Sequence, residues 1–224
     1  MSTRGSSHTR DDGRHWLPSQ GVDPGPLTEL NAECLGLLAL RAADRAAHAD
    51  LPPLLVALRD SWAALPADSV RRLAAAPFSL FDAGFSAAPR WLEGRVRGVH
   101  DQQRCGPAYF DDAAARSITR RMLVYGWHLA RSRPRAACLV FGATLTAVEA
   151  LAACSLSALD AAADRNAGLL RPRWANQPIF WRELLAAAAG NDTRLHELLL
   201  GGIQRLAAET WAVDSPDTTR ASFR

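Results

Sequence analysis

The sequence predicts an all-α protein made of two tandem, similar helical units that pack together as one helical bundle. Three observations lead to this prediction. Alanine and leucine dominate the chain while β-branched residues are few. Apolar residues recur every three or four positions, which is the period of a helix surface. The order of residues in the first half also returns in the second half.

The first helix of the first unit is expected to begin at Leu27. Leu30, Cys34 and Leu38 follow at helical spacing and predict a face directed toward a core. Pro52 and Pro53 suit the first turn of a second helix, which we predict over residues 54–65, because proline lacks the amide that a first turn leaves unpaired.

A third helix is expected to begin near residues 66–69 and to end at Pro77. The aromatic segment that follows, residues 77–85, is predicted to be a loop or a short extended piece. The first unit ends after Trp91.

The second unit has sharper helix signals. Ile118, Met122, Tyr125 and Leu129 form one face of a helix that should end before Pro134, since proline disfavours a helical residue ahead of it.

Two short helices are expected next. Thr146 and Glu149 have the spacing of a capping box, and Ser157 offers a second cap. These signals predict helices from about 146 to 154 and from about 157 to 165, ended by Gly168. A closing helix is expected over residues 192–211.

The repeat rests on rare residues. A shift of 90 positions superposes Trp91 on Trp181 and Glu93 on Glu183, together with Gly36 on Gly126 and Arg41 on Arg131; a shift of 89 superposes Phe85 on Trp174 and Pro89 on Pro178. Tryptophan and proline matches weigh most, because an alanine-rich chain matches itself easily.

The predicted organisation is a disordered tail (1–26), repeat 1 (27–97), a basic linker (98–116), repeat 2 (117–190), a closing helix (191–212) and a second tail (213–224).

Composition excludes several kinds of chemistry. All 26 basic residues are arginine and lysine is absent, so Schiff-base catalysis and a lysine-bearing phosphate loop are excluded. His196-Glu197 lacks the second histidine of a zinc protease motif, and we predict no enzyme activity, no cofactor and no metal. The four cysteines are widely spaced and no secretory leader or membrane span is evident, which favours a cytoplasmic protein.

Arginine is concentrated between residues 90 and 135, a region that contains ten arginines but only four acidic residues. Guanidinium groups bind phosphates and carboxylates in a bidentate manner, so this region is the candidate binding surface; the alternative is a solvated helix face and linker. The candidate residues are Arg116, Arg120, Arg121, Arg131, Arg133 and Arg135. The tryptophans Trp91, Trp127, Trp174 and Trp181 are predicted to be structural anchors.

The segment 146–165 could form a helix-turn-helix that reads DNA. Its second helix, however, offers alanine and aspartate where arginine, asparagine or glutamine would read bases. An ordinary packed helical corner is the other interpretation.

Part of the chain resembles the flagellar master transcriptional regulator family. LNAECLGLLALRAADR and LPADSVRRLAAAPFSLFDAGF are similar to its FlhD subunit through Leu30, Asn31, Leu35, Leu37 and Arg41, and then Leu65, Leu73, Ala74, Phe81 and Phe85; MLVYGWHLAR and LSALDAAADRNAG are similar in layout to its FlhC subunit. The resemblance implies a bacterial regulator that acts within a helical protein complex. The cysteine cluster that binds zinc in FlhC has no counterpart here.

Taken together, the sequence predicts a non-enzymatic bacterial regulator or adaptor that acts through protein–protein contacts, linked to transcription, motility or secretion. Its expected partner is a protein. Direct DNA binding through the arginines of residues 90–135 is the alternative.

Overall fold

The computed structural model describes residues 23–44, 50–85 and 107–214. The described residues are mostly helical, as predicted, and one short pair of strands joins the two halves. Residues 1–22 and 215–224 of the predicted tails, the linker up to residue 106 and Trp91 lie outside the described residues; the predicted tail boundaries are wrong, because α1 already begins at Gly25 and α12 ends at Asp214. The elements of the first half are α1 (Gly25–Ala43), α2 (Pro53–Ala57), α3 (Arg59–Ala63), α4 (Ala67–Ala74) and β1 (Phe81–Asp82). Those of the second half are α7 (Asp112–Ser132), α8 (Pro134–Phe141), α9 (Leu145–Ala152), α10 (Leu156–Asn166), a 3-10 turn (Ala167–Leu169), β2 (Arg171–Pro172), α11 (Pro178–Ala188) and α12 (Asp192–Asp214).

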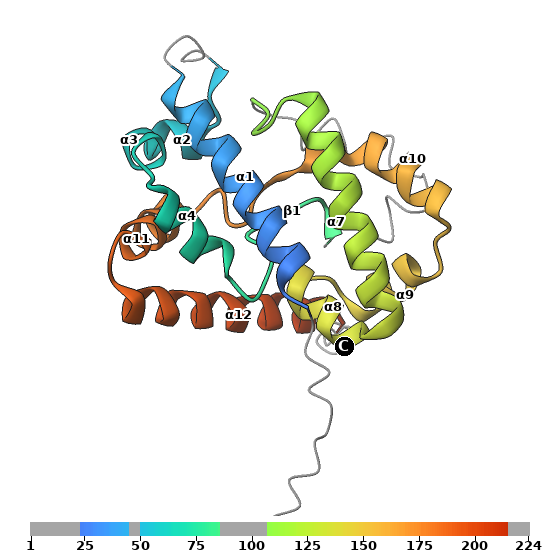
Figure 1. The fold of residues 1–224 in the computed structure, drawn as a ribbon. Coiled ribbons are helices and arrows are strands. Elements are labelled where there is room, and N and C mark those ends of the chain that lie inside the picture. Colours follow the sequence, from blue (N-terminus) through green and yellow to red (C-terminus); the bar gives the residue numbers. More distant parts are fainter. Residues whose placement is uncertain (1–22, 45–49, 86–106, 215–224) are drawn as a thin grey trace, which may run out of the picture.

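Two long helices, α1 and α7, form the face seen in Figure 1, where they run in opposite directions. The carboxylate of Asp111 caps α7 by accepting a hydrogen bond from the Ala114 amide at 2.8 Å. The helix ends at Ser132, which confirms the predicted stop before Pro134. Since α7 begins at Asp112, the last residues of the predicted linker, 112–116, are helical and carry Arg116.

The short helices of the first half differ from the prediction. The single helix expected over 54–65 is wrong, because the chain breaks at Leu58, whose φ of −128° and ψ of 25° leave the helical region. The Leu58 side chain is buried between the two pieces, α2 and α3. Burial of Leu54, Leu55 and Trp62 toward α1 therefore holds two one-turn helices at different angles.

The caps of the second half lie two residues before the predicted ones. Thr144, not Thr146, caps α9 by accepting from the Ala147 amide at 3.2 Å. Ser155, not Ser157, caps α10 by accepting from the Ala158 amide at 3.2 Å. α10 ends at Asn166, close to the predicted end at about residue 165, and continues as a 3-10 turn that contains Gly168.

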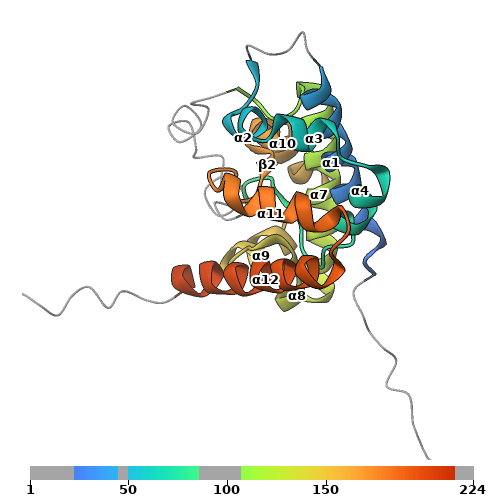
Figure 2. The ribbon, with the colours of Figure 1, turned by 90° about the vertical axis from the view of Figure 1, so that its left-hand side faces the viewer.

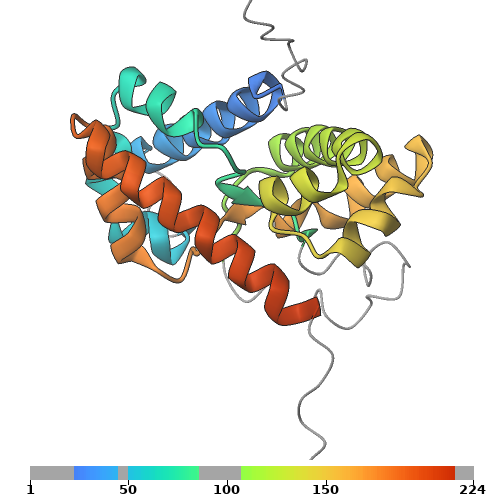
Figure 3. The same cartoon turned by 90° about the horizontal axis from the view of Figure 1, so that it is seen from below.

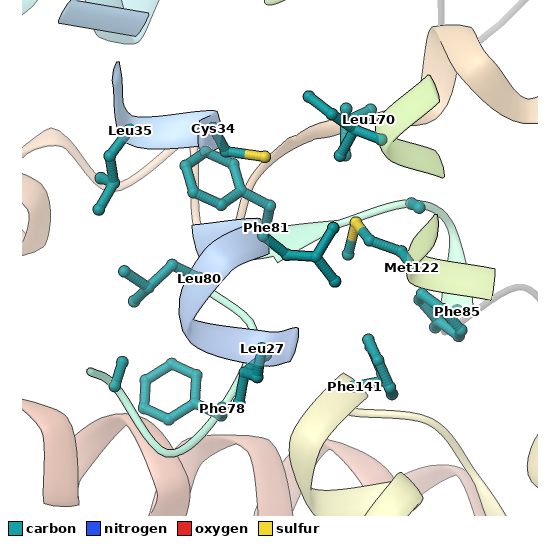
Figure 4. Close-up of a cluster of buried hydrophobic side chains, with 14 of the residues drawn as sticks. Leu27, Cys34, Leu35, Phe78, Leu80, Phe81, Phe85, Met122, Phe141 and Leu170 are labelled. Carbon is teal, nitrogen blue, oxygen red and sulfur yellow. The ribbon is translucent and has the colours of Figure 1, made fainter. Parts of the chain in front are cut away.

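The aromatic segment after α4 passes through the centre of the molecule. It contains β1, which pairs antiparallel with β2 so that Phe81 lies opposite Pro172 and Asp82 opposite Arg171. Figure 4 shows Phe81 between side chains of α1 and α7, with Phe85 stacked on Phe141 at a ring-centroid distance of 4.4 Å. Buried aromatic rings of one short segment thus contact both halves at once.

The last two helices tie the halves together. α11 packs against α3 and α4 of the first half and lies between them and α12 in Figure 2. Its Trp181 is fully buried, with its ring 5.3 Å from that of Trp62. α12 then runs along the underside from α11 to α8 (Figure 3). A helix assigned to repeat 2 therefore completes the core of repeat 1.

Among the helices of residues 23–44, 50–85 and 107–214, none is by itself long and apolar enough to cross a membrane. Only α8 and α9 taken together reach the required length and apolarity, and these two helices are bent by 115°.

Candidate functional site

A groove with a volume of about 950 Å³ opens between the first turns of α1 and the outer face of α7. Both of these helices lie on the side that faces the viewer in Figure 1. Residues from α7 supply most of its wall. The groove is lined by Asp23, Pro26, Glu29 and Leu30 from the α1 end and by Ser117, Arg120, Arg121, Val124, Tyr125, Trp127, His128, Leu129, Ser132 and Arg133 from α7 and the residue after it.

The floor of the groove is apolar. Leu30 and Leu129 are buried, and Val124 is 38% exposed between them and the rim. Ser117, Arg121, Val124 and His128 follow one another at steps of three and four, so they form one stripe along α7. A straight helix therefore presents an apolar centre with polar neighbours at both ends.

The indole of Trp127 is fixed at the edge of this floor. Its N–H donates to the carbonyl of Cys154 at 2.9 Å, and the guanidinium of Arg131 lies 4.7 Å from the ring centroid. Burial raises the pKa of the Cys154 thiol, which stays protonated at neutral pH. This tryptophan links α7 to the turn between α9 and α10 and also exposes part of its ring.

Two of the predicted arginines form ion pairs with residues of neighbouring helices. Arg120 pairs with Asp160 of α10 at 2.8 Å, and Arg121 pairs with Glu33 of α1. All four side chains are partly exposed, so each pair contributes little to folding stability, on the order of 0–1 kcal/mol.

The other four predicted arginines, Arg116, Arg131, Arg133 and Arg135, make no ion pair with any residue that the structure describes. Arg133 lines the groove, while Arg116, Arg131 and Arg135 do not. The structure therefore brings Arg120, Arg121 and Arg133 together in the groove and leaves the remaining three beside it.

Tyr125 joins the two walls, because its hydroxyl donates to the carbonyl of Asp23 at 3.0 Å. Burial, reinforced by the Asp23 carboxylate, raises the pKa of this phenol. The sequence pattern placed Tyr125 on one helix face with Ile118, Met122 and Leu129; those three are buried, whereas Tyr125 is half-buried. Sequence reasoning also missed Val124, Asp23 and Glu29 as lining residues; for Val124, the stripe with Ser117, Arg121 and His128 was the available signal.

Trp174 and Trp181, the other two predicted anchors that the structure describes, lie far from the groove in sequence and make their contacts in the region after β2. The indole N–H of Trp181 donates to the Arg173 carbonyl at 2.7 Å. Trp174 has a φ of 50° and contacts Phe78 and Phe180 edge to face, with ring-centroid distances of 6.0 and 5.0 Å.

The segment proposed as a helix-turn-helix has two helices that each pack against α7. The exposed face of α10 carries Asp164 and Arg165, and Asp160 already binds Arg120. Two carboxylates on this face oppose phosphate binding.

Residues suited to catalysis or metal binding are scattered. Within the described ranges, no three histidine, cysteine or carboxylate side chains lie close enough to hold a metal ion. His128 is exposed in the groove and His196 is exposed on α12. The chain was compared with protein-family models, curated proteins and solved structures, and no match was found.

Proposed function

We propose that this protein is a non-enzymatic bacterial regulator or adaptor, built from a duplicated helical unit, that binds a protein partner through the groove between α1 and α7. A link to transcription, motility or secretion is part of the proposal and rests on the resemblance to the flagellar regulator family. A duplicated unit separates the residues that the fold needs from those that it does not, because the two copies can be compared position by position.

The buried positions of α1 and α7 support a duplication. Adding 88 to the number of every residue that α1 buries gives a residue that α7 buries. The equivalent pairs are Leu27 and Ala115, Leu30 and Ile118, Asn31 and Thr119, Cys34 and Met122, Leu35 and Leu123, Leu38 and Gly126, and Ala42 and Ala130. In this register Gly126 is equivalent to Leu38, not to Gly36 as the tryptophan and proline matches suggest.

The strands support the same relationship at a shift of 90. This shift places β1 on β2, and the two strands pair antiparallel with each other, as two copies related by a two-fold axis would. Two residues beyond each strand the backbone is left-handed, at Gly84 with a φ of 86° and at Trp174 with a φ of 50°. A bulky residue rarely adopts this conformation, so its presence at the equivalent position favours a shared backbone path.

Packing follows the same scheme. α1 packs against α3 and α4, and α7 packs against α9 and α10. Glu33 and Arg121 are equivalent positions at the 88-residue shift, and they pair with each other. A contact between equivalent positions lies on a two-fold axis, and opposite charges there favour pairing of the two halves within one chain.

The observation that carries the functional proposal is the difference between the two copies. At the positions of Arg120 and Trp127, α1 has Ala32 and Ala39. Since α1 keeps the same buried face without these side chains, the fold does not require them. An apolar floor edged by arginine and an anchored tryptophan is typical of a protein-binding surface.

Site-specific cross-linking tests this function. A photoreactive amino acid in place of Ser132, which lines the groove, is compared in the source cell with one in place of Arg182, which is exposed on α11. We expect Ser132 to give a discrete protein adduct that Arg182 does not give. The adduct, identified by mass spectrometry, should form a stoichiometric complex with the purified protein in analytical ultracentrifugation. Adducts from neither position, or identical adducts from both, contradict the proposal.

Direct DNA binding is the second candidate, and it is favoured by Arg133 and Arg135, which form no ion pair with another described residue. It predicts that the protein retains duplex DNA at low salt, and that simultaneous replacement of Arg120, Arg121, Arg133 and Arg135 by glutamine abolishes retention. Absence of retention at low salt excludes this candidate.

A further inference from the structure

We infer that the groove between α1 and α7 binds an acidic amphipathic helix supplied by another protein. This inference rests on the proposed function and adds the chemical nature of the partner. Two properties of the groove lead to it, its shape and the distribution of its charges. The third observation is the charge of the segments outside the described residues.

The shape of the groove fits a helix. Its lining on α7 extends from Ser117 to Arg133, which at 1.5 Å per residue is a length of about 24 Å, or roughly four helical turns. Val124 lies near the centre of this length, and the buried Leu30 and Leu129 also line the groove. An amphipathic helix lays apolar residues at steps of three and four into such a floor.

The charges of the groove favour a carboxylate-bearing occupant along the α7 wall. Arg133 has no ion-pair partner among the described residues, and Arg120 and Arg121 have exposed partners that an incoming carboxylate can replace at little cost. Arg131 holds its guanidinium over Trp127 and makes no ion pair within residues 23–44, 50–85 and 107–214. Bidentate binding of carboxylates is the strong interaction that these groups can offer.

The chain itself does not supply this occupant. The segments outside the described residues, 1–22, 45–49, 86–106 and 215–224, each contain one or two more arginines than carboxylates. None of these segments is net acidic, so none complements the arginines of α7 in charge. An acidic segment must come from a different molecule.

The same groove is poorly suited to nucleic acid. Asp23 and Glu29 form the α1 wall and would repel phosphates, and the floor between the walls is apolar. A helix with acidic residues on one flank only can place that flank against α7 and a polar or basic flank against Asp23 and Glu29. The two-sided charge pattern thus selects a helix over a uniformly charged polymer.

Fluorescence anisotropy with the full-length protein tests the inference. The probe is a labelled helical peptide of about 18 residues, with leucines at helical spacing, glutamates on one flank and glutamines on the other. A matched peptide carries lysine in place of every glutamate, and a labelled duplex of about 20 base pairs is the third probe. We expect a Kd of about 1–100 µM for the glutamate peptide, and binding at least ~10-fold weaker for the other two probes.

Variants locate the site. Val124→Glu blocks the floor and Arg133→Glu reverses the charge of the rim, and each should weaken binding of the glutamate peptide by about 10-fold or more. Val56→Glu and Arg182→Glu are the matched controls, because both residues are exposed on helices that do not line the groove. All four variants change exposed or half-exposed positions, and circular dichroism checks that they fold.

Four results overturn the inference: no binding of the glutamate peptide at about 1 mM, equal binding of the lysine peptide, preferred binding of the duplex, or equal loss in groove variants and controls. If these results occur while cross-linking through Ser132 still yields a stoichiometric protein complex, the inference fails and the proposed function stands. If cross-linking also fails, both are wrong.

Discussion

The buried guanidinium of Arg173 donates from Nε to the carbonyl oxygen of Ser79 at 2.7 Å, across the boundary between the two halves. Its Nη2 donates to the carbonyl of Phe141 at the end of α8. Burial lowers the pKa of the guanidinium, while Asp82 and Glu209 act in the opposite direction. One side chain thus satisfies backbone acceptors in two parts of the chain, residues 79 and 141.

Replacing Arg173 by methionine should lower the free energy of unfolding by about 3 kcal/mol, because two buried carbonyl groups lose their donor. Urea unfolding measures the change. The control is Arg171→Met, at an exposed position two residues earlier, where a change within about 0.5 kcal/mol is expected. Equal effects at the two positions would show that the hydrogen bonds of Arg173 do not stabilise the fold.

Two adjacent glycines of α12 should respond in opposite directions to alanine. A Cβ atom at Gly202 would lie 2.5 Å from Cζ of the buried Phe78, whereas one at Gly201 meets nothing within 4 Å. Gly202→Ala should destabilise the protein by about 1–3 kcal/mol through overpacking. Gly201→Ala should stabilise it by about 0.5–1 kcal/mol, since alanine loses less backbone entropy in a helix. Thermal unfolding measures the stability change of both variants. Changes in the same direction would contradict the close packing of α12 on Phe78.

The buried residues Asn31 and Thr119, which are equivalent under the proposed duplication, should also differ. The Asn31 amide donates to the Phe78 carbonyl at 3.1 Å and accepts from the Leu80 amide at 3.0 Å, whereas the buried hydroxyl of Thr119 has no partner among the residues that the structure describes. Asn31→Leu should therefore cost about 2–4 kcal/mol, because it leaves backbone groups of the aromatic segment unpaired.

Thr119→Val should be neutral or stabilising by up to about 1 kcal/mol, because it removes an unpaired hydroxyl at nearly constant volume. Chemical denaturation compares the two substitutions. Destabilisation by Thr119→Val as large as that by Asn31→Leu would mean that the hydroxyl does find a partner.

Stability should fall in alkaline solution, with Cys34 as one cause. Burial raises the pKa of the Cys34 thiol from its ordinary value of 9.0, with Glu33 adding to the rise. Above pH 9 the unfolded thiol loses its proton and the folded one keeps it, so the contribution is complete below that pH and decreases as the pH rises, by up to about 1.4 kcal/mol per pH unit. Burial also raises the pKa of Tyr109 and Tyr125 above their ordinary value of 10.0. Their contribution to stability therefore also decreases as the pH rises above 10.

Cys34→Ala isolates this effect. The variant is less stable at neutral pH, since it loses buried volume, but its stability should decline less steeply between about pH 9 and pH 10.5. Urea midpoints across this range, with Cys138→Ala at a half-buried position as the control, provide the measurement. Parallel curves for the wild type and Cys34→Ala would rule out a titrating thiol at this position.

The local pattern of residues predicted the long helices, and it failed where competing local signals were close together. Proline at 134 was sufficient to place the end of α7. Thr144 and Thr146 are both able to cap a helix, and only the packing of Ala147 and Val148 against α7 selects the earlier one. The break at Leu58 has no proline or glycine to mark it, since it results from burial of Leu58 itself.

The candidate site was predicted in part. Arginine density identified Arg120, Arg121 and Arg133, because charge is visible in composition. It could not show which arginines lie together, since that depends on α1 crossing α7 near Glu33. The hydrogen bonds of Asn31 and Arg173 join residues more than 30 positions apart, and no local pattern predicts them.

The packing of α11 on α3 and α4 has a consequence for biosynthesis. When the first half of the chain leaves the ribosome, the surface that Trp62 offers to Trp181 has no cover, because the residue that covers it is more than 100 positions away and has not been made. The nascent first half therefore keeps an exposed aromatic patch until α11 has been synthesised. Folding during translation is thereby deferred to the end of synthesis, and a truncated product that stops before residue 178 becomes a target for chaperones and proteases.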